Sequence, residues 1–170
     1  MNDQVKVFIL SFLLLFIALI LQSTLFEFIS IGGAKPDLSL IIIVFIALRK
    51  GKNAGQSLGF ITGLVEDFLS LPVPVGFSAL IKTVIGFLYG LFKGRMFIGP
   101  ILMPVLIILV ATIIKIVLAI VVSFIFPLNG VSFLSFRLLL EIVYNCFFAP
   151  FIFWFLNLFK TFKITDKEKL

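Results

Sequence analysis

Histidine is absent from this 170-residue sequence, and cysteine occurs once, at Cys146. Histidine is the commonest metal ligand in proteins and the usual general base near neutral pH, so its absence argues against both roles. A single cysteine in an apolar stretch supports neither a disulfide framework nor a Cys/His metal site. We therefore expect no metal ion and no cofactor.

Charge is also scarce, because only 13% of the residues are ionised whereas 62% are hydrophobic, and the mean hydropathy is +1.29. A water-soluble domain of this size would not cover so apolar a surface, and long apolar runs are typical of multi-pass membrane proteins. We expect a single membrane domain over residues 1–170. The formal net charge of +6 does not indicate nucleic acid, because the basic residues gather in the connections between apolar runs.

Six apolar segments divide the chain, and each is too long for a membrane β-strand and lacks strand alternation. The sequence therefore predicts an all-α bundle of six transmembrane helices. Their expected bounds are about 5–28, 36–49, 55–71, 76–92, 100–126 and 133–159. The first resembles a signal peptide only weakly, since no small-x-small cleavage pattern follows it, and we interpret it as a retained helix.

The second segment begins with a good helix start, Pro36 followed by Asp37, because proline fits the first turn and an acid suits the positive end of the helix dipole. Its roughly 15 residues span ~22 Å, less than the ~30 Å of a bilayer core. Either the bilayer is thinner there, or neighbouring helices shield the segment.

Basic residues in the connections predict the orientation. With six spans and a cytoplasmic N-terminus, the outer side receives Lys35 alone. The cytoplasmic side receives ten: Lys6, Arg49, Lys50, Lys52, Lys93, Arg95, Lys160, Lys163, Lys167 and Lys169. This bias follows the positive-inside rule and predicts that both termini are cytoplasmic, in a bacterial inner membrane.

Six ionisable residues lie inside the predicted spans and more than two residues from their ends, where such groups are functional candidates by default. They are Glu66, Asp67, Lys82, Lys115, Arg137 and Glu141. Arg137 and Glu141 are one helical turn apart, and Glu141 could pair with both Arg137 and Lys115. A buried network that sets helix rotation and a transport role both remain open for these last three.

Two glycine stripes with a spacing of four predict that the third and fourth segments pack closely as an antiparallel hairpin. The glycines are Gly55, Gly59, Gly63, Gly86, Gly90 and Gly94. If Asp67 pairs with Lys82, the same register places Gly63 against Gly86 and Gly59 against Gly90. Stripes of small residues in membrane helices usually reflect simple packing, and this is the first explanation of the glycines.

A polar edge formed by Thr62, Glu66 and Ser70 lies beside the Asp67 stripe. Glu66 has no evident partner within the chain, so we expect this edge to bind a foreign helix. Ser78 and Lys82 share a helix face, and a Ser–Lys hydrolase dyad is conceivable, although nothing else in the sequence resembles an oxyanion hole.

The first 95 residues resemble the rod shape-determining protein MreD family. The resemblance is carried by "PDLSLIIIVFIAL" from Pro36, "GQSLGFITGLVED" from Gly55 and "GFSALIKTVIGFLYG" from Gly76. It implies a non-enzymatic scaffold of the bacterial cell-elongation machinery. The implied partners are the transmembrane helix of MreC, membrane lipid and, indirectly, MreB filaments and cell-wall (peptidoglycan) synthases. Lys82 is not expected from the family pattern.

The resemblance also implies a six-helix fold similar to the substrate-binding subunits of energy-coupling-factor vitamin transporters. A small-molecule-binding transporter subunit is therefore the alternative function. Those subunits dock their energising partner through an Ala-x-x-x-Ala face on the first helix, and here Ala18 is the only alanine in that segment. Fold likeness alone does not decide function.

Overall fold

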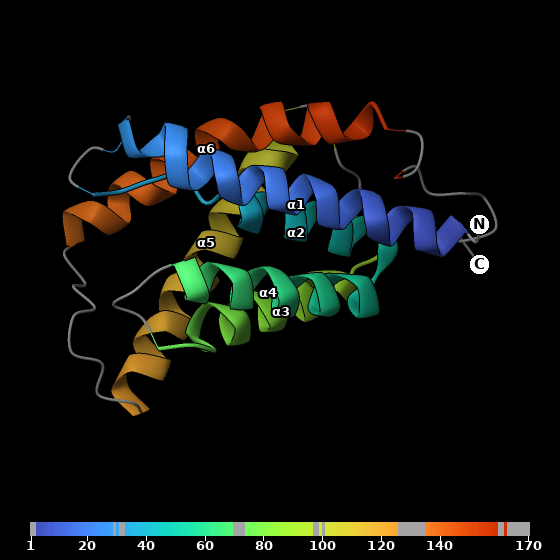
Figure 1. Ribbon diagram of the computed structural model, residues 1–170. Coiled ribbons are helices and arrows are strands. Elements are labelled where there is room, and N and C mark those ends of the chain that lie inside the picture. Colours follow the sequence, from blue (N-terminus) through green and yellow to red (C-terminus); the bar gives the residue numbers. More distant parts are fainter. Residues whose placement is uncertain are drawn as a thin grey trace.

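The computed structural model describes residues 3–28, 30, 33–69, 74–96, 99, 101–125, 135–159 and 162. Each predicted apolar segment forms one helix, which confirms the all-α architecture. The helices are α1 (Asp3–Phe28), α2 (Leu38–Lys50), α3 (Lys52–Leu69), α4 (Phe77–Gly90), α5 (Leu102–Ile125) and α6 (Ser135–Asn157). The start of α1 and the end of α6 lie toward the same end of the bundle (Figure 1).

Three of the helices are both long and apolar enough to cross a membrane: Val5–Thr24 in α1, Leu102–Ile125 in α5 and Phe136–Asn157 in α6. Their outward faces carry large apolar side chains, which suits contact with lipid. The chain is therefore a helical membrane protein. Helices α2, α3 and α4 are shorter, so six complete crossings stay a prediction.

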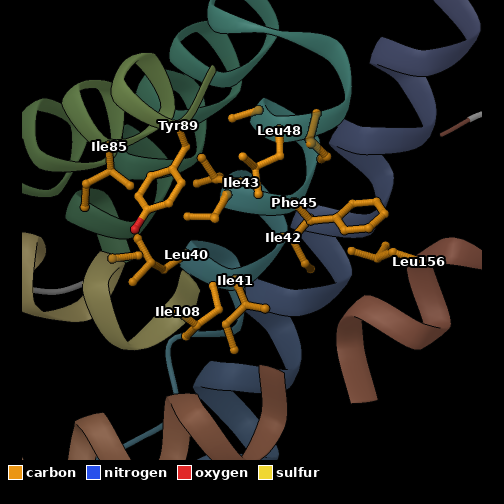
Figure 2. Packing of buried hydrophobic residues seen from close by; sticks show 14 of the residues in the cluster. Leu40, Ile41, Ile42, Ile43, Phe45, Leu48, Ile85, Tyr89, Ile108 and Leu156 are labelled. Carbon is orange, nitrogen blue, oxygen red and sulfur yellow. The ribbon is translucent and has the colours of Figure 1, made fainter. Parts of the chain in front are cut away.

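Helix α2 is the core of the bundle. Every residue from Leu38 to Leu48 is buried, and α2 contacts each of the other five helices. Figure 2 shows α2 side chains packed among Tyr89 of α4, Ile108 of α5 and Leu156 of α6. Of the two explanations for the short second segment, shielding by neighbours is therefore confirmed, because lipid has no access to these residues.

Aromatic contacts hold the C-terminal half of α2 in place. The Phe45 ring meets the rings of Phe153 and Phe162 edge-on, at centroid distances of 5.1 and 5.9 Å. Across the helix, the Tyr89 hydroxyl donates to the backbone oxygen of Ile107 at 2.9 Å, so a polar tip inside the core is satisfied. The ring contacts tie α2 to α6 and to Phe162, whereas the Tyr89 hydrogen bond ties α4 to α5.

A single residue, Gly51, joins α2 to α3. Its backbone has φ of 95°, which L-residues with a side chain rarely adopt, and its N–H donates to Ala47 O at 2.8 Å. Glycine at this position ends α2 and lets α3 start at once. Helix α3 then turns back along α2 and packs tightly against α4, and the two run side by side in Figure 1.

Close packing between α3 and α4 depends on their glycines. A Cβ at Gly55 would overlap the backbone oxygen of Gly86, and a Cβ at Gly59 would overlap that of Lys82. Gly63 faces the Ala79 backbone in the same way. The predicted close-packed antiparallel hairpin is thus confirmed, because each of these contacts leaves room only for hydrogen.

The predicted register of that hairpin is wrong. Gly86 faces Gly55 and not Gly63, a shift of eight residues or about two helical turns. Gly90 meets the backbone of Gly51 and Lys52 instead of Gly59. Gly94 lies beyond the end of α4 with φ of 69° and open space where a Cβ would be, so it is not a packing glycine.

Candidate functional site

Asp37 stands at the N-cap of α2 and organises the charged interior. Its Oδ1 accepts hydrogen bonds from the Leu40 backbone N–H at 3.0 Å and from the Ser39 hydroxyl at 2.8 Å. The Lys82 ammonium lies 3.2 Å from Oδ1, and the Lys115 ammonium lies 2.5 Å from Oδ2. One buried carboxylate therefore caps a helix and binds cations from two others.

The ion pairs continue outward from Asp37 on both sides. Lys82 also binds Oε2 of Glu66, and Lys115 binds Oε1 of Glu141 at 2.7 Å. The result is an alternating series, Glu66–Lys82–Asp37–Lys115–Glu141, which we call the charge chain. It links α3, α4, the start of α2, α5 and α6, with three carboxylates and two ammonium groups.

Each ammonium group of the charge chain touches two carboxylates, and the Lys82 ammonium also donates to the Ser39 hydroxyl. The Lys82 side chain is only 1% exposed. In a medium of low polarity, an ionised group is tolerated when opposite charges and hydrogen bonds surround it. The charge chain meets this condition and fixes the relative positions of five helices.

Neutral polar groups bind the backbone of Asp37. The Asp37 backbone N–H donates to Oδ1 of Asn145 at 2.7 Å, and Nδ2 of Asn145 donates to the Thr112 hydroxyl at 3.1 Å. Thr112 in turn donates to the backbone oxygen of Ile108 at 2.8 Å. This relay connects α6 and α5 to the loop before α2, and both polar side chains are fully buried.

Sequence reasoning missed Ser39, Asn145 and Thr112, and it assigned Asp37 only to a helix start. A signal was present, because Asn145 lies one turn after Glu141 and Thr112 lies one turn before Lys115. A polar residue one turn from a charged residue on an apolar helix shares its face. A search for polar residues one helical turn before and after each intramembrane charge would have found both Asn145 and Thr112.

The predicted pair of Asp67 with Lys82 is wrong. Asp67 instead accepts hydrogen bonds from the backbone N–H groups of Gly76 at 2.8 Å, Ser78 at 2.9 Å and Ala79 at 3.2 Å. The N-cap of α4, Gly76, has no side chain to bind those groups. The first backbone N–H groups of a helix have no partner within the helix, and an apolar medium has no water to bind them. They therefore donate to the nearest carboxylate, which here is Asp67.

This capping role explains the shifted register. Asp67 lies against the first turn of α4, so Lys82, one turn further along, meets Gly59 at the backbone. Glu66 is the neighbour of Asp67 and points about 100° away around the helix. Its longer side chain reaches the Lys82 ammonium.

The reason given for the partner-binding edge is also wrong, since Glu66 has an internal partner. Thr62 is buried at 3% exposure, and Ser70 lies outside the described residues. The docking role of this edge itself stays a prediction. The hydrolase dyad is not supported either, because the Lys82 ammonium is bound by Asp37, Ser39 and Glu66 and is not free to act as a base.

Of the two predicted partners of Glu141, Lys115 is confirmed and Arg137 is not. Glu141 binds Lys115, and among the described residues Arg137 forms no ion pair with a carboxylate. The Arg137 guanidinium lies close to Gly33, in the connection before α2. The predicted intramembrane charges therefore separate into the charge chain, the cap at Asp67, and Arg137, which pairs with no described carboxylate.

A cavity of about 400 Å³ lies next to the N-terminal end of α2, and we call it the α2 cavity. Its walls come from α1, the connection before α2, α3, α5 and α6, and polar groups dominate them. The lining residues are Leu19, Gln22, Ser23, Gly33, Ala34, Lys35, Asp37, Glu66, Leu69, Lys115, Arg137 and Glu141. Much of the charge chain thus forms one side of a cavity at the end of the bundle.

Comparison with protein-family models identifies a relative of this chain. The family model of rod shape-determining protein MreD matches residues 2–159 of the 170 residues. No curated protein and no solved structure matches the chain. Because the match runs from the start of α1 past the end of α6, it covers the charge chain and the whole helical bundle. The chain belongs to the MreD family of rod shape-determining proteins.

Proposed function

We propose that this protein is a non-enzymatic membrane scaffold of the rod complex, which binds the transmembrane helix of MreC and couples MreB to peptidoglycan synthesis. The observation that carries the proposal is the family match over residues 2–159. In this role the protein recognises another helix within the bilayer and carries out no chemistry on a substrate.

The arrangement of charge supports a scaffold. The charge chain and the Asp67 cap use intramembrane ionised groups to hold helices together. The outward faces of α1, α5 and α6 are apolar, with exposed residues such as Phe12, Val117 and Phe151. A foreign helix would meet a rigid surface of large side chains, and van der Waals packing drives helix association in lipid.

The bilayer orientation belongs to the same proposal. Both termini are placed in the cytoplasm and the cavity at the outer end, because Lys35 lies beside the cavity whereas Arg49 and Arg95 lie toward the other end of the helices. In this orientation the scaffold presents helices to MreC within the bilayer and faces wall synthesis with its cavity side.

The test is a transfer of the partner helix alone. The transmembrane segment of MreC is fused to an unrelated soluble protein, co-expressed with this chain and purified in mild detergent. We expect the fusion to co-purify, whereas a fusion with the same residues in scrambled order should not. Equal recovery of both fusions would contradict recognition of a specific helix.

The cavity favours one second candidate, a binding subunit of a transporter of the energy-coupling-factor type. A cavity of about 400 Å³ falls in the range of small-molecule sites. Against this candidate, Ala18 is buried in the core and is not presented to a partner protein. Co-purification of ATP-binding-cassette subunits would favour the transporter over the scaffold.

A further inference from the structure

The α2 cavity exists because α2 is shorter than the helices around it. Its 13 residues extend ~20 Å, whereas the 24 residues of α5 extend ~36 Å. The longer helices therefore continue past the N-terminal end of α2 and enclose a space. Asp37 lines this space at the start of α2. A space between lipid-embedded helices would normally be filled by apolar side chains, but here charged groups from four parts of the chain line it.

Several lining groups have bonding capacity that the fold does not use. Arg137 is exposed and forms no ion pair with a described carboxylate. Glu66 and Glu141 each use one carboxylate oxygen for a lysine, which leaves the other oxygen for a further donor. The amide oxygen of Gln22 is buried and has no hydrogen-bond partner among the described residues, a costly state unless a ligand or water donates to it.

These groups form a dipolar site. Arg137 offers planar donors that match the oxygens of a phosphate. Glu66, Glu141 and Gln22 offer acceptors that match an ammonium group with several N–H bonds. The apolar side chain of Leu69 also lines the cavity and is exposed, so a hydrocarbon chain attached to the ligand would have a compatible surface.

We propose that the cavity binds phosphoethanolamine, as the headgroup of a membrane lipid. Its phosphate lies on Arg137, and its ammonium lies between Glu66 and Glu141 and donates to Gln22. The acyl chains leave along the exposed Leu69 into the bilayer. Binding in this place would fill the space left by the short α2. It would also bring the lipid headgroup into direct contact with the charge chain. The proposal does not depend on the scaffold role.

The experiment uses the full-length protein, purified in mild detergent and stripped of lipid. Phosphatidylethanolamine, phosphatidylcholine and phosphatidylglycerol are added separately, and bound lipid is measured by native mass spectrometry and by the thermal unfolding midpoint. We expect phosphatidylethanolamine to bind and stabilise most. Phosphatidylcholine has no ammonium N–H to donate, and phosphatidylglycerol has no ammonium group. Equal or better binding of phosphatidylglycerol would overturn the proposal.

Two variants and one control test the residues. R137Q should weaken phosphatidylethanolamine binding about tenfold or more, since hydrogen bonds between charged groups are among the strongest. R95Q removes an exposed arginine that does not line the cavity and should bind the lipid as the unsubstituted protein does. Wild-type affinity in R137Q would refute the assigned phosphate site.

Gln22→Leu separates a ligand contact from a structural role. We expect the lipid-free variant to unfold at or above the wild-type temperature, because a buried acceptor without a partner is removed. Its stabilisation by phosphatidylethanolamine should shrink. Undiminished stabilisation would show that Gln22 does not contact the ligand and would contradict the proposed ammonium position.

The source of the ligand is decided by glycerophosphoethanolamine, which has the same headgroup without acyl chains. If the membrane lipid is the ligand, this soluble compound should compete only at far higher concentration. Competition at equal concentration would assign the site to a soluble phosphoethanolamine compound and overturn the lipid part of the proposal.

Discussion

Replacing Lys82 with methionine tests whether the charge chain holds the bundle together. The substitution keeps a long apolar side chain but removes an ammonium group that is 1% exposed and binds Asp37, Ser39 and Glu66. Two carboxylates, Asp37 and Glu141, would then share Lys115, and Glu66 would lose its counter-ion. Breaking a buried ion pair by removing one partner typically costs about 3–5 kcal/mol.

For a chain of this length, 1 kcal/mol corresponds to about 2–4 °C in unfolding midpoint, so K82M should unfold about 6–20 °C lower. The midpoint is measured on detergent-solubilised protein. R95Q is the matched control, because it removes an exposed cation outside the charge chain, and it should stay within about 0.5 kcal/mol of the wild type.

A second substitution sharpens the same test. In the double variant E66Q/K82M the carboxylate left without a counter-ion is also neutralised. We therefore expect the double variant to be more stable than K82M alone, although E66Q is itself destabilising. A K82M midpoint within about 2 °C of the wild type, which corresponds to less than 1 kcal/mol, would refute the reasoning. So would a double variant no better than K82M.

Two further outcomes are expected from the structure and one from the proposed orientation. G59A should lower the unfolding free energy by about 1–3 kcal/mol, because the added methyl overlaps the Lys82 backbone, whereas the exposed S57A on the same helix should change it little. Exchanging charges between Asp67 and Lys82 should not rescue the single variants in a melting assay, since Asp67 caps α4 and does not pair with Lys82. Alkaline phosphatase fused after Leu170 should be inactive in cells if the C-terminus is cytoplasmic, and high activity would contradict the proposed orientation.

Much of the fold could be predicted because it depends on local signals. Apolar runs separated by glycine, proline and charge indicated six helices, and the glycine spacing indicated the tight α3–α4 pair. The Pro36–Asp37 start was also recognised, and Asp37 is indeed the N-cap of α2. These features need only a few neighbouring residues to be interpreted.

The charge chain could not be predicted in the same way, because its partners are far apart in sequence. Asp37 meets Lys115 across 78 residues and meets Asn145 across 108. The residue spacing pairs Asp67 with Lys82 and leaves Glu66 without a partner, and the need to cap α4 reverses that assignment. That choice also moved the helix register by two turns.

Purification of the intact protein from native membranes in mild detergent, with identification of the retained proteins, tests the scaffold claim most directly. The proposal predicts that MreC is recovered in an amount comparable to this chain, and that it is lost when its transmembrane helix is replaced by one of unrelated sequence. Recovery of ATP-binding-cassette subunits without MreC would contradict the scaffold function.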